Sequence, residues 1–367
     1  MLLRRQYLEK DRGMSDAGEY TVDITPREPI TCLWVKLQAT NGATSCRNNT
    51  LAENISAIEI IDGADVVFSL SGVEAYALAC RALGRMPFSV FDEDAGQSQT
   101  VMIPILFGRF IGDSELAFDP TKYSNPQVRI KWNLAAVTAV GATGFVALSL
   151  QLSIIAELMI GVSAPAALLS GKRIYTYTTA AGGYEYIEMP TDEPWRYLFL
   201  RGYKLLTDWH WIYDEVKLSC DGGKFVAFDM RGWDMVQRSS LYQAPFHYMA
   251  KRRAINAQRV QFVLRFGDHA TPISDGTGDT VYELVHNANG EGTIGIRTTN
   301  VAAAANVNYY ENVEGYHPYD VHTVVFGRPD EIGDFFPAQN YGSVRLEVKA
   351  GVAAALQYIF LQTLRLQ

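Results

Sequence analysis

The six histidines are the residues best suited to hold a metal ion. They are His210, His247, His269, His286, His317 and His322. A metal-binding duplicated barrel of the cupin type needs two histidines separated by one residue, together with a carboxylate, and no pair here has that spacing. The nearest approach is the run His317-Pro-Tyr-Asp320-Val-His322, which we interpret as a turn with surface histidines. We therefore predict no metal site and no cofactor.

Two further groups suggest ligand binding by residue type alone. Asp275-Gly-Thr-Gly-Asp279 is acidic and glycine-rich like a calcium loop, but it lacks the D-x-D-x-D spacing and the distal Glu. Asp208, Trp209 and Trp211 are residues of the kind that line a sugar groove. Because Trp209 and Trp211 would share one face of a strand, we favour core packing for both. The alternative is a carbohydrate-binding or carbohydrate-processing double jelly-roll protein.

The sequence lacks the motifs of catalytic loops. It contains no G-x-S-x-G elbow, no H-E-x-x-H pair and no G-x-x-x-x-G-K-[ST] loop. The acidic run Asp92-Glu93-Asp94 lies in a glycine-containing loop, where we expect solvated carboxylates. We therefore predict that the chain is not an enzyme.

The charge balance argues against a general nucleic-acid binder. The 367 residues include 32 Lys and Arg against 40 Asp and Glu, a net charge of −8, whereas binding phosphates requires a cationic surface. Four cysteines without a C-x-x-C pair support neither a zinc ribbon nor a disulfide framework. The first five residues do not resemble a secretory signal. We expect a protein matured in a reducing cytosol that does not bind a genome directly.

One stretch is long enough to span a membrane. Trp132 to Ala156 covers 25 residues without a formal charge. Gly141 and Gly144 interrupt it, and its second half alternates between large apolar and small or polar residues. A period of two is typical of a strand, so we predict a strand there.

The sequence contains one pattern twice. Residues 18–34 align with residues 183–199 at an offset of 165, which places Glu28-Pro29 on Glu193-Pro194. Ile61-Asp62-Gly63 then matches Cys220-Asp221-Gly222, and further matches follow in the same order. Matches in a constant order indicate a duplicated domain.

The copies diverge towards their ends. Residues 101–108 resemble residues 260–267, whereas residues 128–131 match residues 344–347, which leaves about 57 additional residues in the second copy. Phe326-Gly327-Arg328 also echoes Phe107-Gly108-Arg109, so the insertion point is open. The predicted organisation is a leader arm at 1–17, a first domain at 18–155, a linker at 156–182, and a second domain at 183–367 with an insertion at about 268–325.

Each copy consists of short strand-like runs and one helix. In the first copy we predict a helix at 72–85, with its counterpart at 232–242, and strands at 19–24, 30–38, 55–61, 65–70, 100–107, 127–133 and 145–155. Asp62-Gly63 and Asp221-Gly222 are typical of tight hairpin turns. Such a series of strands, with a helix after the fourth, predicts an all-β fold of two tandem eight-stranded jelly-roll β-sandwiches.

This arrangement resembles the double jelly-roll major capsid proteins of icosahedral viruses, many of them membrane-containing. The resemblance covers essentially the whole chain and rests on tandem jelly rolls, one helix in each, and a long insertion in one copy. The runs Ile103–Arg109 and Tyr123–Val128 resemble the loop and strand sequences of prokaryotic members of this family. The resemblance implies homotrimers whose six jelly rolls form pseudo-hexameric capsomers of a virion shell, with the subunit made in the host cytoplasm.

The resemblance also implies contact residues and partners. The insertion would form an outward tower loop with trimer contacts, for which the candidates are Asp275, Asp279, His286 and Asn289. The leader residues Arg4, Arg5, Lys10 and Arg12 would lie beneath the shell or on the viral lipid membrane. Neighbouring capsomers, penton proteins and minor capsid proteins would be further partners.

Overall fold

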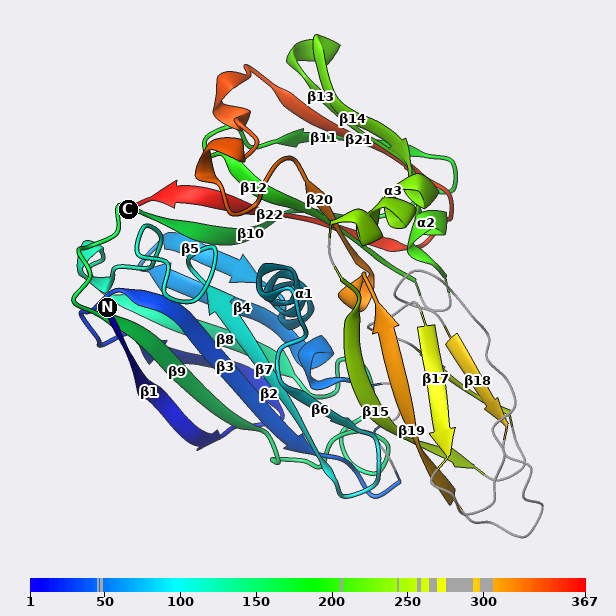
Figure 1. Cartoon of the computed structure of the whole chain (residues 1–367). Coiled ribbons are helices and arrows are strands. Elements are labelled where there is room, and N and C mark those ends of the chain that lie inside the picture. Colours follow the sequence, from blue (N-terminus) through cyan, green and yellow to red (C-terminus); the bar gives the residue numbers. More distant parts are fainter. Residues whose placement is uncertain are drawn as a thin grey trace.

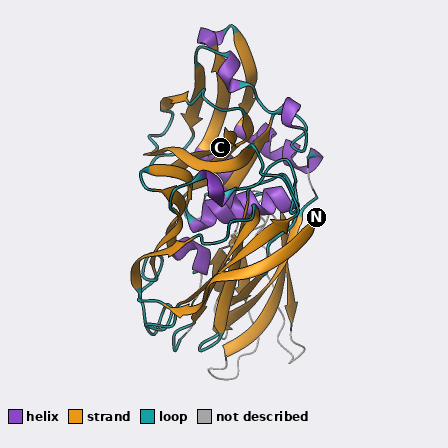
Figure 2. Cartoon of the chain, turned by 90° about the vertical axis from the view of Figure 1, so that its left-hand side faces the viewer, coloured by secondary structure: helices purple, strands orange, loops and turns teal. Residues whose placement is uncertain are grey.

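The chain folds into two stacked jelly rolls, with long strands and short helices (Figures 1 and 2). The computed structural model describes residues 1–44, 46, 49–204, 207–242, 244–255, 259–263, 269–274, 293–297 and 306–367. In the part of the chain that is described, no helix combines the length and the apolar character that a membrane crossing requires.

The first jelly roll packs two four-stranded layers against each other. One layer has the order β1 (Leu2–Gly13), β9 (Gln151–Ile160), β3 (Ile30–Thr40) and β7 (Ser98–Leu106). The other has the order β2 (Ala17–Asp23), β8 (Pro126–Asn133), β4 (Ile55–Asp62) and β5 (Asp65–Leu70). The predicted strand at 145–155 is shifted, because Phe145 forms only an isolated bridge with Asn41 and a turn follows before β9 begins.

The second jelly roll repeats this order strand for strand. Its layers are β10 (Ala167–Thr178), β22 (Leu356–Leu366), β12 (Trp195–Tyr203) and β20 (Val321–Val325), and β11 (Tyr184–Met189), β21 (Val344–Ala350), β13 (Tyr213–Cys220) and β14 (Phe225–Arg231). Irregularities repeat as well, since the pairing of β4 with β5 shifts at the same place as that of β13 with β14. The structure therefore has the predicted fold, two tandem jelly rolls.

The predicted leader and linker are wrong, because both contain a strand. Residues 2–13 form β1 and residues 167–178 form β10, and each is the first strand of its jelly roll. A register shift follows Tyr7 in β1 and Arg173 in β10, which equates these two residues. Because β1 is largely exposed and carries many charges, it lacks the apolar alternation that marks the other strands.

Helix α1 (Gly72–Leu83) follows β5, and α3 (Gly232–Arg238) follows β14, as the repeat predicts. A further short helix, α2 (Trp209–Ile212), precedes β13. The capping box of Ser71 and Glu74 starts α1, and Gly84, with a φ of 64°, ends it. Nine of the twelve residues of α1 are buried, because it lies between the two jelly rolls (Figure 1).

The insertion begins earlier in the chain than predicted. It occupies the segment between α3 and β20, which corresponds to the segment between α1 and β7 that holds β6 (Ser89–Asp92). Its strands are β15 (Phe246–Ile255), β16 (Arg259–Val263), β17 (His269–Ser274), β18 (Thr293–Arg297) and β19 (Asn306–Gly315). The match of residues 101–108 with 260–267 is therefore wrong, and the Phe-Gly-Arg echo after β20 is the true counterpart.

The insertion is attached to the first jelly roll. Strand β15 pairs in parallel with β6, joining Ala250 to Phe91, and in antiparallel with β19 (Figure 1). Lys251 reinforces the junction, because its Nζ lies 2.7 Å from an Asp94 oxygen. The segments that follow the helix in the two copies therefore form one continuous sheet.

Candidate assembly surfaces

The first surface of interest is the junction at which one jelly roll already binds the other. Strand β10 pairs in parallel with β5 through Lys172 and Ser69. The approach is close at Gly171, where a Cβ would lie 2.7 Å from the ring of Phe68. Only glycine allows such an approach without displacing the ring.

A buried ion pair fixes this junction. The Glu74 carboxylate on α1 is fully buried and accepts hydrogen bonds from Arg173 Nε at 2.8 Å and Nη2 at 2.6 Å. It also accepts one from the Ser71 backbone amide at 2.8 Å. Burial alone would lower the pKa of Arg173, but Glu74 outweighs it and raises that pKa. Because Arg173 keeps a third of its side chain exposed, it balances the charge of a carboxylate that has no contact with water.

A second ion pair joins the start of β5 to the end of β22. Arg365 on β22 donates to Asp65 at 2.5 Å and to the Val66 carbonyl at 3.1 Å. Both ion pairs therefore connect the layer of β10 and β22 in the second jelly roll to α1 and β5 of the first jelly roll.

A repeated Arg–Asp contact follows β7 and β20. Arg109 Nε donates to Asp113 at 2.7 Å, and Arg328 Nε donates to Asp334 at 2.7 Å. Burial alone would raise the pKa of Asp113, but hydrogen bonds from Arg109 and nearby amides outweigh it and lower that pKa. The two loops touch, because Arg109 also donates to the Asp330 carbonyl at 3.1 Å. The Phe-Gly-Arg echo in the sequence thus corresponds to a repeated structural unit.

His317 and His322 are buried, contrary to the prediction of surface histidines. Their side chains lie at the junction, where His322 stacks on Trp209 at 4.8 Å and its Nδ1 lies 3.3 Å from His317 Nε2. His317 Nε2 lies 2.8 Å from the Ser239 hydroxyl of the second jelly roll. Among the described residues, no group of three or more His, Cys, Asp or Glu is placed to hold a metal ion.

The turn between the two histidines reaches into the first jelly roll. Tyr319 packs edge-on against Tyr76 of α1 at 5.8 Å, and its hydroxyl lies 2.8 Å from that of Thr50. Tyr319 and Asp320 have φ values of 55° and 58°, a conformation that non-glycine residues adopt only when their surroundings impose it. The turn therefore links both jelly rolls and the base of the insertion.

The tryptophans of the expected sugar groove do not share a surface. Trp209 and Trp211 lie on α2 rather than on a strand, so their side chains diverge. Trp209 is fully buried and donates to the Leu200 carbonyl, whereas Trp211 is 58% exposed. Nothing in this arrangement favours carbohydrate binding.

The basic residues of β1 contact their own chain. Arg5 lies 2.8 Å from the buried Glu157, and Arg4 lies 3.1 Å from Glu28. Lys10 lies over the ring of Tyr7, and Arg12 over that of Tyr20. The four tower candidates, Asp275, Asp279, His286 and Asn289, lie outside the described residues.

The junction residues carry little signal in the sequence. Arg173 fell within the predicted linker, and Glu74 was one residue of a helix with no sign of a partner. The only available signal was the offset of the repeat, which, extended to the start of the chain, would have revealed β1 and β10.

Comparison with solved structures places the fold among viral coat proteins. No protein-family model and no curated protein matches the sequence. The major capsid protein P2 of bacteriophage PM2 has a TM-score of 0.55 at 9% identity, over 100% of this chain and 98% of that one. VP54 of PBCV-1 has a TM-score of 0.60 at 10% identity, and the match covers 100% of this chain and 95% of that one. The STIV MCP has a TM-score of 0.58 at 9% identity, and the match covers 99% of this chain and 96% of that one. The chain therefore has the double jelly-roll fold of these major capsid proteins.

Proposed function

We propose that this chain is a structural major capsid protein whose homotrimers form pseudo-hexameric capsomers of an icosahedral virion shell. The observation that carries the proposal is the complete second jelly roll, matched to the first strand for strand. Solved capsid proteins of similar fold match along nearly their whole length, which adds support. Three subunits with closed symmetry would present six similar domains, as hexagonal tiling requires.

The mechanism in this proposal is assembly rather than catalysis. Neighbouring capsomers, penton proteins and minor capsid proteins would be the partners in the virion, after synthesis in the host cytoplasm. The net charge of −8 fits a shell that does not itself neutralise a genome. A viral membrane beneath the shell would separate this acidic protein from the genome.

Size-exclusion chromatography with light scattering tests the proposal. Three subunits of 40.8 kDa predict a particle of about 122 kDa, or larger assemblies in which negative-stain images show hexagonal blocks. A monomer at every protein concentration would contradict the proposal.

A further inference from the structure

A pocket of about 430 Å³ opens between the two jelly rolls, beside the start of α1. Ser71 and Val73 line it from the first jelly roll, and Arg173, Arg201 and Tyr358 line it from β10, β12 and β22 of the second. Its volume lies within the range of small-molecule sites. Because its walls come from both jelly rolls, a molecule bound there would contact both.

Arg201 is a half-buried cation whose N–H donors lack an acceptor in the described part of the chain. Its Nε is buried and has no hydrogen-bond partner there. Its Cζ lies 4.7 Å from the centre of the Tyr358 ring and 5.6 Å from that of Tyr203. Aromatic rings contact the face of a guanidinium, whereas its N–H donors lie in its plane. The two tyrosines therefore hold Arg201 in place without using its donors.

The other charges that line this pocket are already engaged. Arg173 binds the Glu74 carboxylate through Nε and Nη2. The Glu53 carboxylate, on the side of the first jelly roll, accepts hydrogen bonds from the amide and the hydroxyl of Thr50, at 3.0 Å and 2.8 Å. The charge of Arg201 is therefore the one that these groups leave without a counterion. Partial burial of such a charge costs free energy unless water or an anion offsets it.

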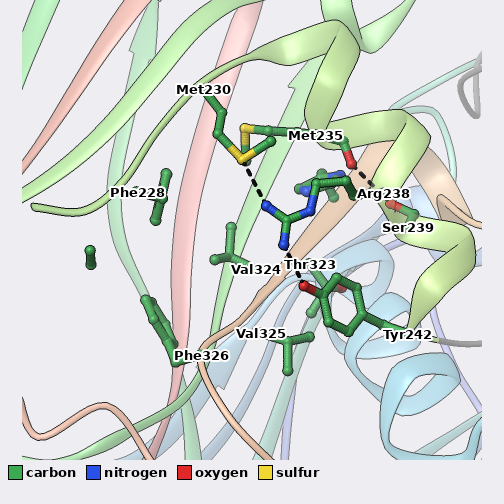
Figure 3. Close-up of a pocket in the computed structure, with 12 residues that line it drawn as sticks. Phe228, Met230, Met235, Arg238, Ser239, Tyr242, Thr323, Val324, Val325 and Phe326 are labelled. Carbon is green, nitrogen blue, oxygen red and sulfur yellow. Dashed lines mark hydrogen bonds between the residues drawn. The ribbon is translucent and has the colours of Figure 1, made fainter.

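A second pocket, of about 260 Å³, also contains an arginine, but its surroundings differ (Figure 3). Apolar side chains such as Phe228 and Met230 line it. Arg238 is exposed there and donates to the Tyr242 hydroxyl at 2.8 Å. Water can solvate an exposed guanidinium, so nothing about Arg238 calls for a bound anion. It is a matched control for Arg201.

We propose that the pocket at Arg201 binds a phosphate group, either as inorganic phosphate or as part of a phosphate monoester. The planar fork of an arginine matches the oxygens of a phosphate and forms two parallel hydrogen bonds with them. Tyr358 supplies a hydroxyl donor, and Arg173 supplies Nη1, which Glu74 does not use. The site goes beyond the proposed assembly role, because it takes a ligand that no contact between subunits involves.

Isothermal titration calorimetry on the full chain tests the site, with inorganic phosphate and glycerol phosphate as the two probes and sodium chloride keeping the ionic strength constant. The wild type should bind one phosphate per chain. Arg201→Met should weaken binding by about tenfold or more, because it removes the fork and its charge. Arg201→Lys should fall between the two, since it keeps the charge without the fork. Arg238→Met should bind like the wild type.

The two probes distinguish the source of the phosphate group. Equal affinity for both would assign the site to inorganic phosphate, and tighter binding of glycerol phosphate would assign it to a monoester. Failure of the wild type to bind either probe would overturn the proposal, and so would equal affinities of the wild type and Arg201→Met. Neither result would bear on the proposed capsid function, which light scattering tests.

A second measurement needs no variant. Phenylglyoxal modifies arginines, and mass spectrometry of peptides locates the modified residues. Phosphate should slow the modification of Arg201 severalfold in the wild type and leave that of Arg238 unchanged, because a bound anion covers only the first guanidinium. Modification of Arg201 at the same rate with and without phosphate would overturn the site, even if Arg201→Met did not fold.

Discussion

The free energy of unfolding should fall as the pH drops from about 7.5 to about 5.5, and His322 should carry a measurable share of that loss. His322 is 4% exposed, with Trp209 stacked on its ring. Burial, and then the charges of His317 and Arg81, hold its pKa well below the ordinary value. Asp320, two residues before His322 in the same turn, is also buried.

The magnitude follows from proton linkage. An unfolded histidine binds a proton below about pH 6.5, whereas the folded protein keeps His322 neutral, so acidification favours the unfolded chain. The contribution is fully present above that value and declines below it. For one histidine that stays neutral when folded, the loss between about pH 7.5 and about pH 5.5 amounts to about 1.4 kcal/mol. Carboxyl groups with lowered pKa values, such as Asp113, keep their contribution in this range because they lose it only at lower pH.

Urea denaturation at both pH values, at one protein concentration, measures this loss. His322→Gln removes the titrating group while keeping a polar side chain next to His317. The wild type should lose about 1.4 kcal/mol more than His322→Gln over this range. His210→Gln is the matched control, because burial also lowers the pKa of His210 but the side chain is half-buried and should matter less. Equal losses in the wild type and His322→Gln would refute the reasoning.

Two further predictions concern the junction and the glycine that begins both α1 and α3. Arg173→Met should lower the free energy of unfolding by about 3 kcal/mol, because it leaves the Glu74 carboxylate buried without its counterion, and Glu74→Gln should be milder at about 1–2 kcal/mol; urea denaturation of both variants checks the order. Gly232→Ala should destabilise by about 2–4 kcal/mol, because its Cβ would lie 1.8 Å from the Tyr213 carbonyl oxygen. Gly13→Ala, with nothing within 4 Å, should stay within about 0.5 kcal/mol in the same thermal-unfolding assay.

The strands with one buried face were predictable from the sequence. The bounds predicted for β4 and β5 agree with the structure to within a residue, because alternation and the Asp62-Gly63 turn define both ends. Helix α1 was predictable from its apolar face and from Ser71 with Glu74 three residues later. In both cases the signal lies within the element itself, so no distant contact was needed to find it.

What the sequence could not predict depends on distant parts of the chain. Strand β1 is exposed along most of its length, so its identity rests on pairing with β9, some 150 residues away. His317 and His322 are polar residues in a short turn, a pattern typical of a surface. They are buried because three parts of the molecule meet at that turn, a fact that no local pattern contains.

The two copies of the duplicated domain differ in what covers the face beside their helix. Inside the chain, β10 packs beside β5 and α1 and contributes a buried ion pair to Glu74. Breaking that contact would leave the Glu74 carboxylate without its counterion. The equivalent face of the second jelly roll presents Phe225 and Trp233, which are 46% and 44% exposed. Apolar and neutral polar contacts can form and separate without stranding a buried charge. The face beside the helix is therefore tied to its own chain in the first jelly roll and presents apolar side chains to solvent in the second.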